Sequence, residues 1–452
     1  MKHFSVIILA AGLGTRMKSC LPKVVHNVGC KSMINRVVDA VKILKPDNIV
    51  VVLGYKSEFI EKLLVGEKIK FAYQKEQLGS ADAVKQAQKI FESYFGDILV
   101  INGDVPLIKS SSISKLINLK NKTNYPAAVL ASKTDEPFGY GRIVRNGLFL
   151  EKIIEEKDAS PVEKQIKEVN SGIYCFSKDI WKILPKIKPN KAKKEYYITD
   201  VVEILNRLGE KVCVSLNEDF CEVMGINNKM ELANAERILN SRKVHELLNK
   251  GVMFLDINNV YISDDAKIGE DTKIYPGVFV DRNVSIGKNC TVKGSSYIIN
   301  SEIEDNCVIS YSYINGVKLS KNVKIGPFAH LRPETILKEN VKVGNFSEIK
   351  KSVVSRNSKV NHLSYIGDSN IGANVNIGAG TITCNYDGAK KHQTVIGSNS
   401  FIGSNVNFVA PVRIGKNVLI GAGSTITKNV KSGLVAIERS SQITKKRVNR
   451  SE

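Results

Sequence analysis

The chain has 452 residues, and its hydrophobic content of 43% and charged content of 25% are those of a folded globular protein. This length allows two or more domains, and no apolar run reaches the roughly 18–20 residues that a membrane-spanning helix needs. The net charge of +21 would suit nucleic-acid binding, but the lysines are spread along the chain without a recognition motif. We therefore expect solvated surface and attraction for phosphorylated small molecules.

Cysteine usage and the amino-terminal segment indicate the compartment. The eight cysteines include no C-x-x-C pair, so we expect free reduced thiols and neither a zinc site nor a redox motif. The apolar start SVIILAA is short and runs directly into a Gly-Thr-Arg segment, unlike a secretory signal. These features predict a cytoplasmic protein with no membrane and no nucleic-acid partner.

The first part of the chain, residues 1–227, alternates apolar runs with helical patterns. SVIILAA, NIVVVLG, DILVING and YPAAVLA are bounded by turn residues and predict buried strands, whereas SADAVKQAQKIFESY predicts a helix between two of them. Such alternation is typical of a parallel sheet covered by helices on both faces. Ligands of these α/β folds bind at the carboxyl ends of the strands.

Two further segments follow. Residues 228–250 lack Pro and Gly and carry Leu232, Ala235, Leu239 and Leu247 at near-helical spacing, which predicts a helical linker. Residues 251–452 form the third part, where aliphatic residues recur every six positions, blur around 300–360 and then return. A six-residue repeat predicts a parallel β-helix with inward aliphatic side chains and Gly or Asn at its corners. The regular positions are Ile262, Ile268, Ile274, Val280, Ile286, Val292, Ile298, Ile396, Ile402, Phe408, Ile414, Ile420 and Ile426.

A glycine-rich loop with two cations follows the first predicted strand. The segment LAAGLGTRM starts at Leu9 and contains Arg16, and Lys23 follows shortly after it. Glycines let a backbone approach a nucleotide closely, and the cations can neutralise a triphosphate. The spacing fits neither a Walker loop nor a dinucleotide-binding fingerprint. Beside this loop, Asp104 at the end of DILVING is a candidate Mg²⁺ ligand, although in isolation such a residue is more often a helix cap.

The repeats also contain polar residues that packing does not require. The excursion Gly380–His392 interrupts the regular coils, and such loops often carry function. His362 lies in NHLSYIGD, while Arg332 and Lys350 supply cations of the kind that bind phosphate. A β-helix that served only as a scaffold would not need these residues.

The motifs of the first part resemble those of the sugar-phosphate nucleotidyltransferases, which have a Rossmann-like α/β domain. The closer resemblance is to the bifunctional bacterial N-acetylglucosamine-1-phosphate uridyltransferase/glucosamine-1-phosphate acetyltransferases, and it runs over nearly the whole chain. It rests in order on LAAGLGTRM, PKV, EQLGSADA, GDVPL, GYGRI, EEKDA, VNSGIY, EYYITD and GINN. Ser80 replaces a more usual Thr, Asn102 stands where the family often has an aromatic residue, and Cys20 is atypical.

The resemblance implies roles for individual residues of the first part. It places Mg²⁺ between Asp104 and Asn227, and it makes Arg16 and Lys23 the groups that stabilise the transition state. It places the sugar on Gly141, Glu155 and Asn170. The remaining nucleotide contacts that it implies are Leu9, Ala10, Ala11, Gly12, Gln74, Gly79, Ser80, Asn102 and Gly103.

The third part resembles the acetyltransferase half of the same family, a left-handed β-helix. The matching segments are FAHLRPE, VGNFSEIKK, HLSYIGD, NIGAGTITCNYDG and VAPV. The resemblance makes His362 the general base, oriented by Glu348. It implies that Arg332, Lys350, Tyr365, Asn376 and Asn385 hold the sugar phosphate, with Lys391 reaching in from a neighbouring subunit of a homotrimer. The implied acetyl-CoA contacts are Ala379, Asn385, Tyr386, Ser404, Ala422 and Arg439.

The resemblance therefore implies a two-step enzyme. It would acetylate glucosamine-1-phosphate with acetyl-CoA and then couple the product to UTP with Mg²⁺, giving pyrophosphate and UDP-N-acetylglucosamine for peptidoglycan, lipopolysaccharide and other cell-envelope precursors. Two alternatives remain open at this point. One is a single-activity nucleotidyltransferase with a structural β-helix, and the other is a basic nucleic-acid-binding or assembly protein.

Overall fold

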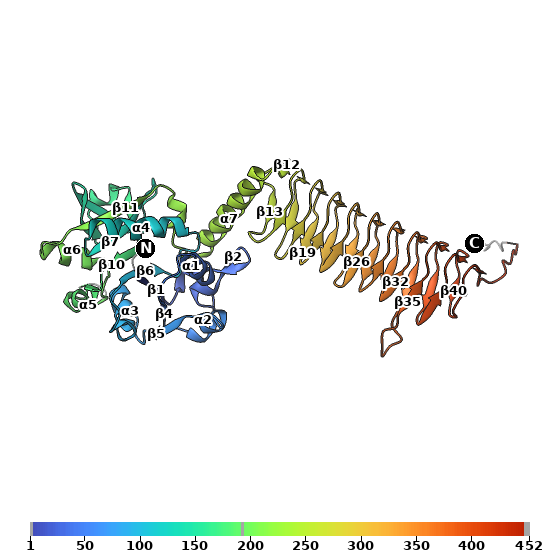
Figure 1. Ribbon diagram of the computed structural model, residues 1–452, viewed down its shortest axis with the longest axis horizontal. Coiled ribbons are helices and arrows are strands. Elements are labelled where there is room, and N and C mark those ends of the chain that lie inside the picture. The colour runs from blue at the N-terminus through green and yellow to red at the C-terminus, as the bar shows by residue number, and fades with distance from the viewer. Residues whose placement is uncertain (1–2, 191–193, 447–452) are drawn as a thin grey trace, which may run out of the picture. The chain divides into compact units, whose positions relative to one another are not determined.

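The computed structural model describes residues 3–190 and 194–446 and divides into two compact units, with the boundary between Leu239 and Asn240. The first unit is built on a sheet in the strand order β11-β7-β10-β6-β1-β4-β5, to which the β8–β9 hairpin is added (Figure 1). Its strands are β1 (Phe4–Ala10), β4 (Ile49–Leu53), β5 (Lys70–Tyr73), β6 (Asp97–Asn102), β7 (Ala127–Lys133), β8 (Arg142–Asn146), β9 (Phe149–Ile154), β10 (Glu168–Phe176) and β11 (Val212–Asn217). A separate short hairpin joins β2 (Asn27–Val28) to β3 (Lys31–Ser32).

The strands expected from the sequence are present, but the sheet is mixed rather than parallel. β1, β4, β5 and β6 pair in parallel, whereas β10 runs antiparallel to both β6 and β7. The reason is the connection, because β10 returns from the β8–β9 hairpin without the crossover helix that a parallel strand needs.

Helices cover both faces of this sheet. Alternate side chains of one strand enter opposite layers, since Ile7 of β1 packs with one cluster and Ile8 with the other. The first layer contains α3 (Ser80–Gln86), α5 (Ile180–Ile183) and α6 (Asp200–Arg207). The second contains α1 (Met33–Lys42), α2 (Ser57–Leu63) and α4 (Ser110–Thr123). Because β1 and β6 pair in parallel, their carboxyl ends lie at the same edge of the sheet.

Helix α7 (Lys229–Asn249) corresponds to the predicted linker and belongs to both units. In its first half, Ala235 is buried against Met33 and Ile226 of the first unit. In its second half, Leu247 is buried in the core of the repeats with Val252. No helix among the described residues is both long enough and apolar enough to cross a membrane.

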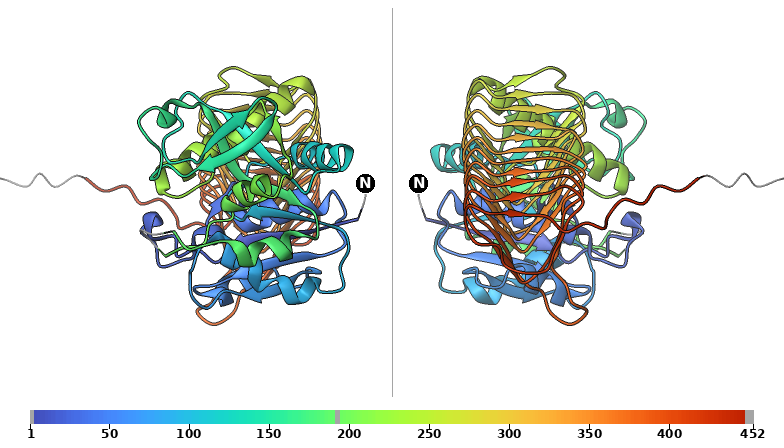
Figure 2. Two further views of the ribbon diagram at one scale, coloured as in Figure 1. Left: turned by 90° about the vertical axis from the view of Figure 1, so that its left-hand side faces the viewer. Right: turned by 90° about the vertical axis from the view of Figure 1, so that its right-hand side faces the viewer.

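The second unit is a left-handed parallel β-helix made of three parallel sheets, and each strand pairs with the strand one coil later (Figures 1 and 2). One face consists of β12 (Met253–Phe254), β15 (Lys273–Ile274), β18 (Thr291–Lys293), β21 (Val308–Ser310), β24 (Lys324–Ile325), β27 (Lys342–Asn345), β30 (Lys359–His362), β33 (Asn376–Ile377), β36 (Phe401–Ile402), β39 (Leu419–Ile420) and β41 (Val435–Ala436). The next consists of β13 (Val260–Ile262), β16 (Val278–Val280), β19 (Tyr297–Ile299), β22 (Tyr313–Asn315), β25 (His330–Leu331), β28 (Glu348–Lys350), β31 (Tyr365–Gly367), β34 (Ile382–Cys384), β37 (Asn407–Val409) and β40 (Thr425–Ile426). The third consists of β14 (Lys267–Ile268), β17 (Ser285–Ile286), β20 (Glu302–Ile303), β23 (Val317–Leu319), β26 (Thr335–Leu337), β29 (Val353–Val354), β32 (Ser369–Ile371), β35 (Thr394–Ile396) and β38 (Val412–Ile414).

The aliphatic hexad positions form one continuous core, and the coils pass through residues 300–360 without a break. The six-residue period blurs there because some sides are five residues long, as between the buried Ile298 and Ile303 and between Ile309 and Ile314. The inward side chains still stack, since Ile303 pairs with Leu319 of the next coil. A shortened side changes the period but not the fold.

Asparagine at the corners has two roles. Asn340, Asn357, Asn374 and Asn399 adopt left-handed backbone conformations, with φ between 57° and 61°, which asparagine tolerates better than most residues. Their side-chain amides also form a ladder, since each donates to the next at 3.0, 3.0 and 2.9 Å. The same residue type therefore permits the turn and joins consecutive coils.

Candidate active sites

The first candidate site lies where β1 and β6 end in the first unit. A cavity of about 550 Å³ opens beyond these ends, and the loop that follows β1 forms one wall. It brings together twelve of the residues expected from the sequence: Leu9, Ala10, Ala11, Gly12, Arg16, Lys23, Gln74, Gly79, Ser80, Asn102, Asp104 and Asn227. These residues come from stretches as far apart as Leu9 and Asn227, so only the fold makes them neighbours.

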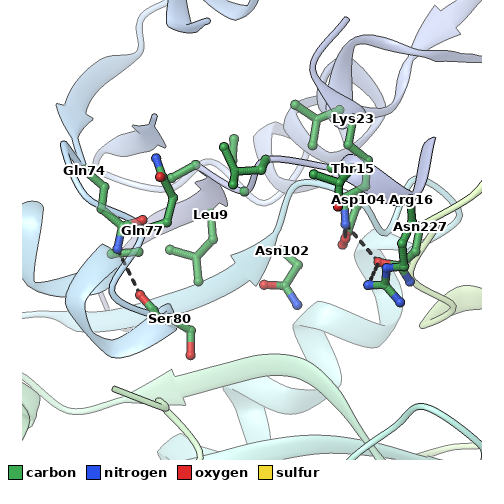
Figure 3. Close-up of a pocket in the computed structure, with 18 of the residues that line it drawn as sticks. Leu9, Thr15, Arg16, Lys23, Gln74, Gln77, Ser80, Asn102, Asp104 and Asn227 are labelled. Carbon is green, nitrogen blue, oxygen red and sulfur yellow. Dashed lines mark hydrogen bonds and ion pairs between the residues drawn. The ribbon is translucent and has the colours of Figure 1, made fainter. Parts of the chain in front are cut away.

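Charged and amide groups gather at one end of this cavity (Figure 3). The Lys23 ammonium forms an ion pair with Asp104 and donates to Asn227 Oδ1 at 3.0 Å. Arg16 Nη2 donates to the same Asn227 oxygen at 2.9 Å. Two cations and two oxygen donors thus share one small volume.

The backbone of the loop explains why glycine is needed beside Lys23. Gly14 has φ of +63°, and a Cβ atom there would lie 2.7 Å from the Lys23 Cβ atom. Any larger residue would push Lys23 away from Asp104 and would also strain the backbone. The glycine therefore positions the cation and does not merely shorten the loop.

The three expected sugar-binding residues do not all line a cavity: Glu155 does, whereas Gly141 and Asn170 do not. Glu155 lines a neighbouring cavity of about 770 Å³ that shares Thr15, Arg16 and Glu195 with the first. Burial raises the pKa of Glu155, although the Thr199 hydroxyl, which donates to it at 3.1 Å, acts in the opposite direction.

Three other expected residues do not line either cavity. Gly103 lies behind the wall, where its backbone N–H donates to the Leu9 carbonyl at 2.9 Å. The Asn170 backbone N–H donates to the Gly141 carbonyl at 2.8 Å, and the Asn170 amide donates to the Tyr174 hydroxyl at 2.7 Å. Gly141 and Asn170 are therefore neighbours, as the sequence led us to expect, but in this structure they lie outside the cavity linings.

The second candidate site surrounds His362 at the end of β30. His362 pairs in register with Asn345 of β27, one coil earlier, and its Nδ1 lies 2.7 Å from Asn345 Oδ1. The ring is otherwise exposed. Its position at the corner after β30 leaves Nε2 open to solvent and to a substrate.

The structure gives Glu348 a different partner from the one expected. Glu348 accepts a hydrogen bond from Arg332 Nη1 at 2.8 Å and lies 4.0 Å from His330 Nδ1. It belongs to β28 and pairs with Tyr365, whereas His362 belongs to β30 on the neighbouring face and pairs with Asn345. The partner of the His362 ring in this chain is Asn345, and orientation of the histidine by Glu348 stays a prediction.

A cluster of cations lies beside this histidine face. Lys391 contacts Lys350 and lowers its pKa, and the positive charge of Arg332 acts in the same direction. In this single chain Lys391 lies by Lys350 of the same chain, and its approach to the site of a neighbouring subunit stays a prediction. The loop between β34 and β35 brings it there, and this loop projects from the regular coils (Figure 1). Like charges held this close favour an anionic ligand.

Hydrogen bonds order the projecting loop. Asn385, only 7% exposed, donates from Nδ2 to Asp368 Oδ2 at 2.5 Å. Tyr386 and Lys391 form a β-bridge across the loop. Asp387 accepts from the Lys390 backbone and from His392 Nε2 at 2.6 Å, and these contacts hold the pKa of its carboxyl well below the usual range. The expected substrate residues are therefore held in place before any ligand binds.

The remaining expected residues lie along consecutive coils. The Ala379 carbonyl accepts from Asn405 N at 2.7 Å, and the Ser404 carbonyl accepts from Gly423 N at 2.8 Å. Ala422 follows Ser404 by one coil, and Arg439 passes beside Gly423. Tyr365 pairs with Glu348, and Asn376 pairs with Lys359. Four of the expected acetyl-CoA residues, Ala379, Ser404, Ala422 and Arg439, thus follow one another along the coils, whereas Asn385 and Tyr386 lie in the projecting loop.

Known proteins resemble this chain along its whole length. It is 47% identical to the bifunctional protein GlmU of Caldicellulosiruptor saccharolyticus over 98% of this chain and 96% of that protein. It is 46% identical to the bifunctional protein GlmU of Carboxydothermus hydrogenoformans over 97% and 98% of the two chains. The chain belongs to the GlmU family.

Family models divide this GlmU family member at the same place as the fold. A nucleotidyl transferase model matches residues 5–221. A GlmU-like C-terminal hexapeptide model matches residues 292–373, and a bacterial transferase hexapeptide model matches residues 393–428. A model of the GMPPB C-terminal domain matches residues 256–318. These matches confirm the fold class predicted from the sequence.

Sequence reasoning missed several residues at both sites. Thr15, Gln77 and Glu195 line the first cavity, and the motifs TRM, EQLGS and EYYITD that contain them were the available signal. Asn345 and Asp368 contact His362 and Asn385, each from one coil earlier. Stacking at a distance of 17 residues leaves no local pattern, so only the coil register reveals these two contacts.

Proposed function

We propose that the two sites of this chain perform consecutive steps with the residues described above. As a GlmU family member the chain is a bifunctional enzyme, with acetyltransferase and UDP-N-acetylglucosamine pyrophosphorylase activities. The β-helix acetylates glucosamine-1-phosphate with acetyl-CoA. The first unit then transfers UMP from UTP to N-acetylglucosamine-1-phosphate, which releases pyrophosphate and gives UDP-N-acetylglucosamine.

At the first site we assign an in-line displacement. A phosphate oxygen of the sugar phosphate attacks the α-phosphorus of UTP, the new P–O bond forms, and the bond to the β-phosphate bridge breaks to release pyrophosphate. Arg16 and Lys23 neutralise the developing negative charge, and the cavity walls align the two substrates. No side-chain nucleophile is required.

The residues at this site suit a divalent metal ion. The oxygens of Asp104 and Asn227 converge on one cation, the Lys23 ammonium, so their positions allow both to bind a single ion. Hard oxygen ligands of this number, with phosphate supplying others, are those that Mg²⁺ prefers. Asp104 and Asn227 would hold Mg²⁺, which would supply positive charge to neutralise the triphosphate, and Lys23 would then be available to the phosphates.

At the second site we assign general base catalysis to His362. The glucosamine nitrogen attacks the thioester carbonyl of acetyl-CoA, the C–N bond forms, and the C–S bond breaks to release coenzyme A. His362 Nε2 accepts the proton from the amine while Asn345 holds the ring through Nδ1. Arg332, Lys350 and Lys391 attract the sugar phosphate. Lys350 lies in β28, on the face of the β-helix next to that of His362 in β30, which supports this assignment.

We propose that the β-helix assembles as a homotrimer. Hexapeptide-repeat proteins commonly form oligomers, and one corner of this β-helix supports such an assembly. Tyr311, Phe328, Phe346 and Leu363 project from four successive coils with left-handed φ angles between 45° and 58°. Their exposed fractions are 49–62%, and the rings of Phe328 and Phe346 stack at 5.6 Å. Bulky apolar residues in strained, exposed conformations fit a surface that another subunit covers.

One observation carries the proposal, namely that a cation-rich cavity and an Asn-oriented histidine occur on separate units of one chain. The test is an assay with glucosamine-1-phosphate, acetyl-CoA, UTP and Mg²⁺, with each component omitted in turn. We expect acetylated sugar phosphate without UTP, and the nucleotide sugar only with all components. Failure to acetylate would favour a single-activity nucleotidyltransferase with a scaffolding β-helix.

A further inference from the structure

Gln74 is a polar side chain buried in the wall of the first cavity. It follows β5, and only 4% of the residue is exposed. Its backbone N–H donates to the Leu53 carbonyl at 2.8 Å, which fixes the residue at the end of the strand. Figure 3 shows its side chain turned toward the start of α3, where Ser80 lies. A buried amide in a ligand cavity has its orientation set by its partners.

Both hydrogens of the Gln74 amide group are already engaged. Nε2 donates to the Gly79 carbonyl at 3.0 Å and to Asp82 Oδ2 at 2.8 Å. These two acceptors carry no hydrogen, so a flipped amide would place Oε1 against two oxygens. These two acceptors therefore fix the orientation of the Gln74 amide. Oε1, which has no hydrogen-bond partner in the described part of the chain, remains as an acceptor for a ligand in the cavity.

Asp82 is well placed to impose this orientation. It lies in the first turn of α3, and its second oxygen, Oδ1, accepts from Gln86 Nε2 at 3.1 Å. The carboxylate is thus held from both sides and directs one oxygen at Gln74. Asp82 does not line the cavity itself, so its influence on a ligand passes through Gln74.

We propose that Asp82 is a specificity-determining positioning residue, which selects uracil over cytosine by fixing the Gln74 amide with its oxygen toward the base. This inference rests on the proposed uridyl transfer at this cavity. Uracil presents an N3–H donor, which Gln74 Oε1 can accept. Cytosine presents an unprotonated N3 acceptor at the same place, and two acceptors facing each other leave a buried polar group unpaired. Discrimination against CTP follows.

The decisive variant is Asp82→Asn, which keeps the size of the side chain and supplies an N–H₂ group. The new amide can donate to Gln74 Oε1, so the flipped Gln74 that suits cytosine is no longer opposed by a carboxylate. The Gly79 carbonyl still favours the original orientation. We expect the ratio of kcat/KM for UTP to that for CTP to fall about 10-fold, the value of one such hydrogen bond.

A ratio is needed because Asp82 also stabilises the start of α3 through the helix dipole. A purely structural loss would lower the rates with UTP and CTP together and leave their ratio unchanged, and that result would overturn the proposal. Circular dichroism and thermal unfolding of the same variant report whether the first unit is folded. Asp39→Asn, which removes an exposed partner of Lys31 in the same unit, is the matched control and should keep the wild-type ratio.

A measurement on the wild-type enzyme keeps the proposal testable if Asp82→Asn does not fold. UTP methylated at N3 lacks the donor that Gln74 Oε1 accepts, so we expect kcat/KM to be at least about 100-fold lower than with UTP. Equal use of both triphosphates would overturn the inference. No turnover of UTP by the wild type would instead contradict the proposed function itself.

Discussion

The Nδ1 atom of His362 lies 2.7 Å from the Oδ1 atom of Asn345, the residue that pairs with it in the preceding coil. A carbonyl oxygen can only accept, so in the neutral ring this contact favours the tautomer with its proton on Nδ1 and its lone pair on Nε2. A general base needs an available lone pair directed at the substrate. The parallel register of two strands therefore selects the tautomer that acetyl transfer requires.

Substitution of Asn345 should alter the pH dependence of acetyl transfer. In Asn345→Asp a carboxylate replaces the carbonyl and stabilises the protonated imidazole, which cannot act as a base. The acid limb of the kcat/KM profile for acetyl transfer should therefore move to higher pH. In Asn345→Leu the acceptor is lost, and we expect kcat to fall about 10-fold or more. Steady-state rates between pH 5.5 and about 9 would measure both effects.

A purely structural role for Asn345 would lower the rate at every pH without moving the acid limb. Uridyl transfer by the same variants is the internal control, since its site lies in the other unit. The corner asparagine Asn357 offers a matched variant, Asn357→Leu, because it belongs to the ladder and contacts no candidate substrate residue. The acid limb of the kcat/KM profile of Asn357→Leu for acetyl transfer should stay at the wild-type pH.

The two activities should be separable by single substitutions. His362→Ala removes the general base and should lower acetyl transfer about 100-fold or more, while uridyl transfer from supplied N-acetylglucosamine-1-phosphate stays at the wild-type rate. Asp104→Asn should do the reverse, with a loss of pyrophosphate release of more than about 10-fold. Separate assays of each half reaction check both. Loss of both activities in either variant would contradict two independent sites.

Removal of divalent metal should stop only one reaction. Asp104 and Asn227 converge on one cation in the first unit, whereas His362 and the cluster around Lys350 use no metal in the proposed mechanism. Addition of EDTA should abolish nucleotide-sugar formation, and excess Mg²⁺ should restore it. Acetyl transfer in the same tube should continue unchanged. An EDTA-sensitive acetyl transfer would show that the second site has been misassigned.

Replacement of the Asp200 carboxyl group by an amide should stabilise the first unit above about pH 6. Burial, reinforced by Glu203 and Asp158, raises the pKa of Asp200 to about 6. The folded state therefore binds more protons than the unfolded state between about pH 4 and 6, so this group lowers stability as pH rises through that window. Asp200→Asn removes the penalty. Because Asp200 is partly exposed, we expect a gain of about 1 kcal/mol at pH 8.

That gain should depend on pH, which distinguishes it from a general packing effect. At about pH 3, below both pKa values, the wild-type carboxyl is mostly protonated in both states, so Asp200→Asn and the wild type should unfold at nearly the same temperature. Thermal unfolding at about pH 3 and about pH 8 measures the difference. An equal shift at both values would point to packing. Asp179→Asn, at an exposed carboxyl of the same unit, is a suitable comparison.

Charge at the apolar corner of the β-helix should disrupt assembly. The double variant Phe328→Asp and Phe346→Asp places two carboxylates on the corner that we propose to be covered by another subunit. Repulsion and desolvation should yield a monomer, which light scattering after size exclusion would detect. Acetyl transfer should fall and uridyl transfer should persist. Lys318→Asp, at an exposed position on another face, should leave the assembly intact.

Part of this fold follows from local sequence alone. Each side of a coil must place one aliphatic residue inward. The six-residue spacing of Ile262, Ile268 and Ile274 therefore predicts the β-helix from the sequence alone. Apolar runs such as IVVVL likewise predict buried strands without knowledge of their neighbours. The motif segments around Arg16 and His362 also identify the two candidate sites, because their residue types carry the chemistry.

Contacts within the sites depended on tertiary structure. Asn345 meets His362 because stacked coils bring together residues that are 17 positions apart, and Lys391 meets Lys350 because a loop folds back on its own chain. The antiparallel β10 also depended on how the chain returned to the sheet. Inward-facing positions obey a local period, and the sequence by itself determined them. Hydrogen-bond partners depend on which segments become neighbours, and only the folded chain decided that.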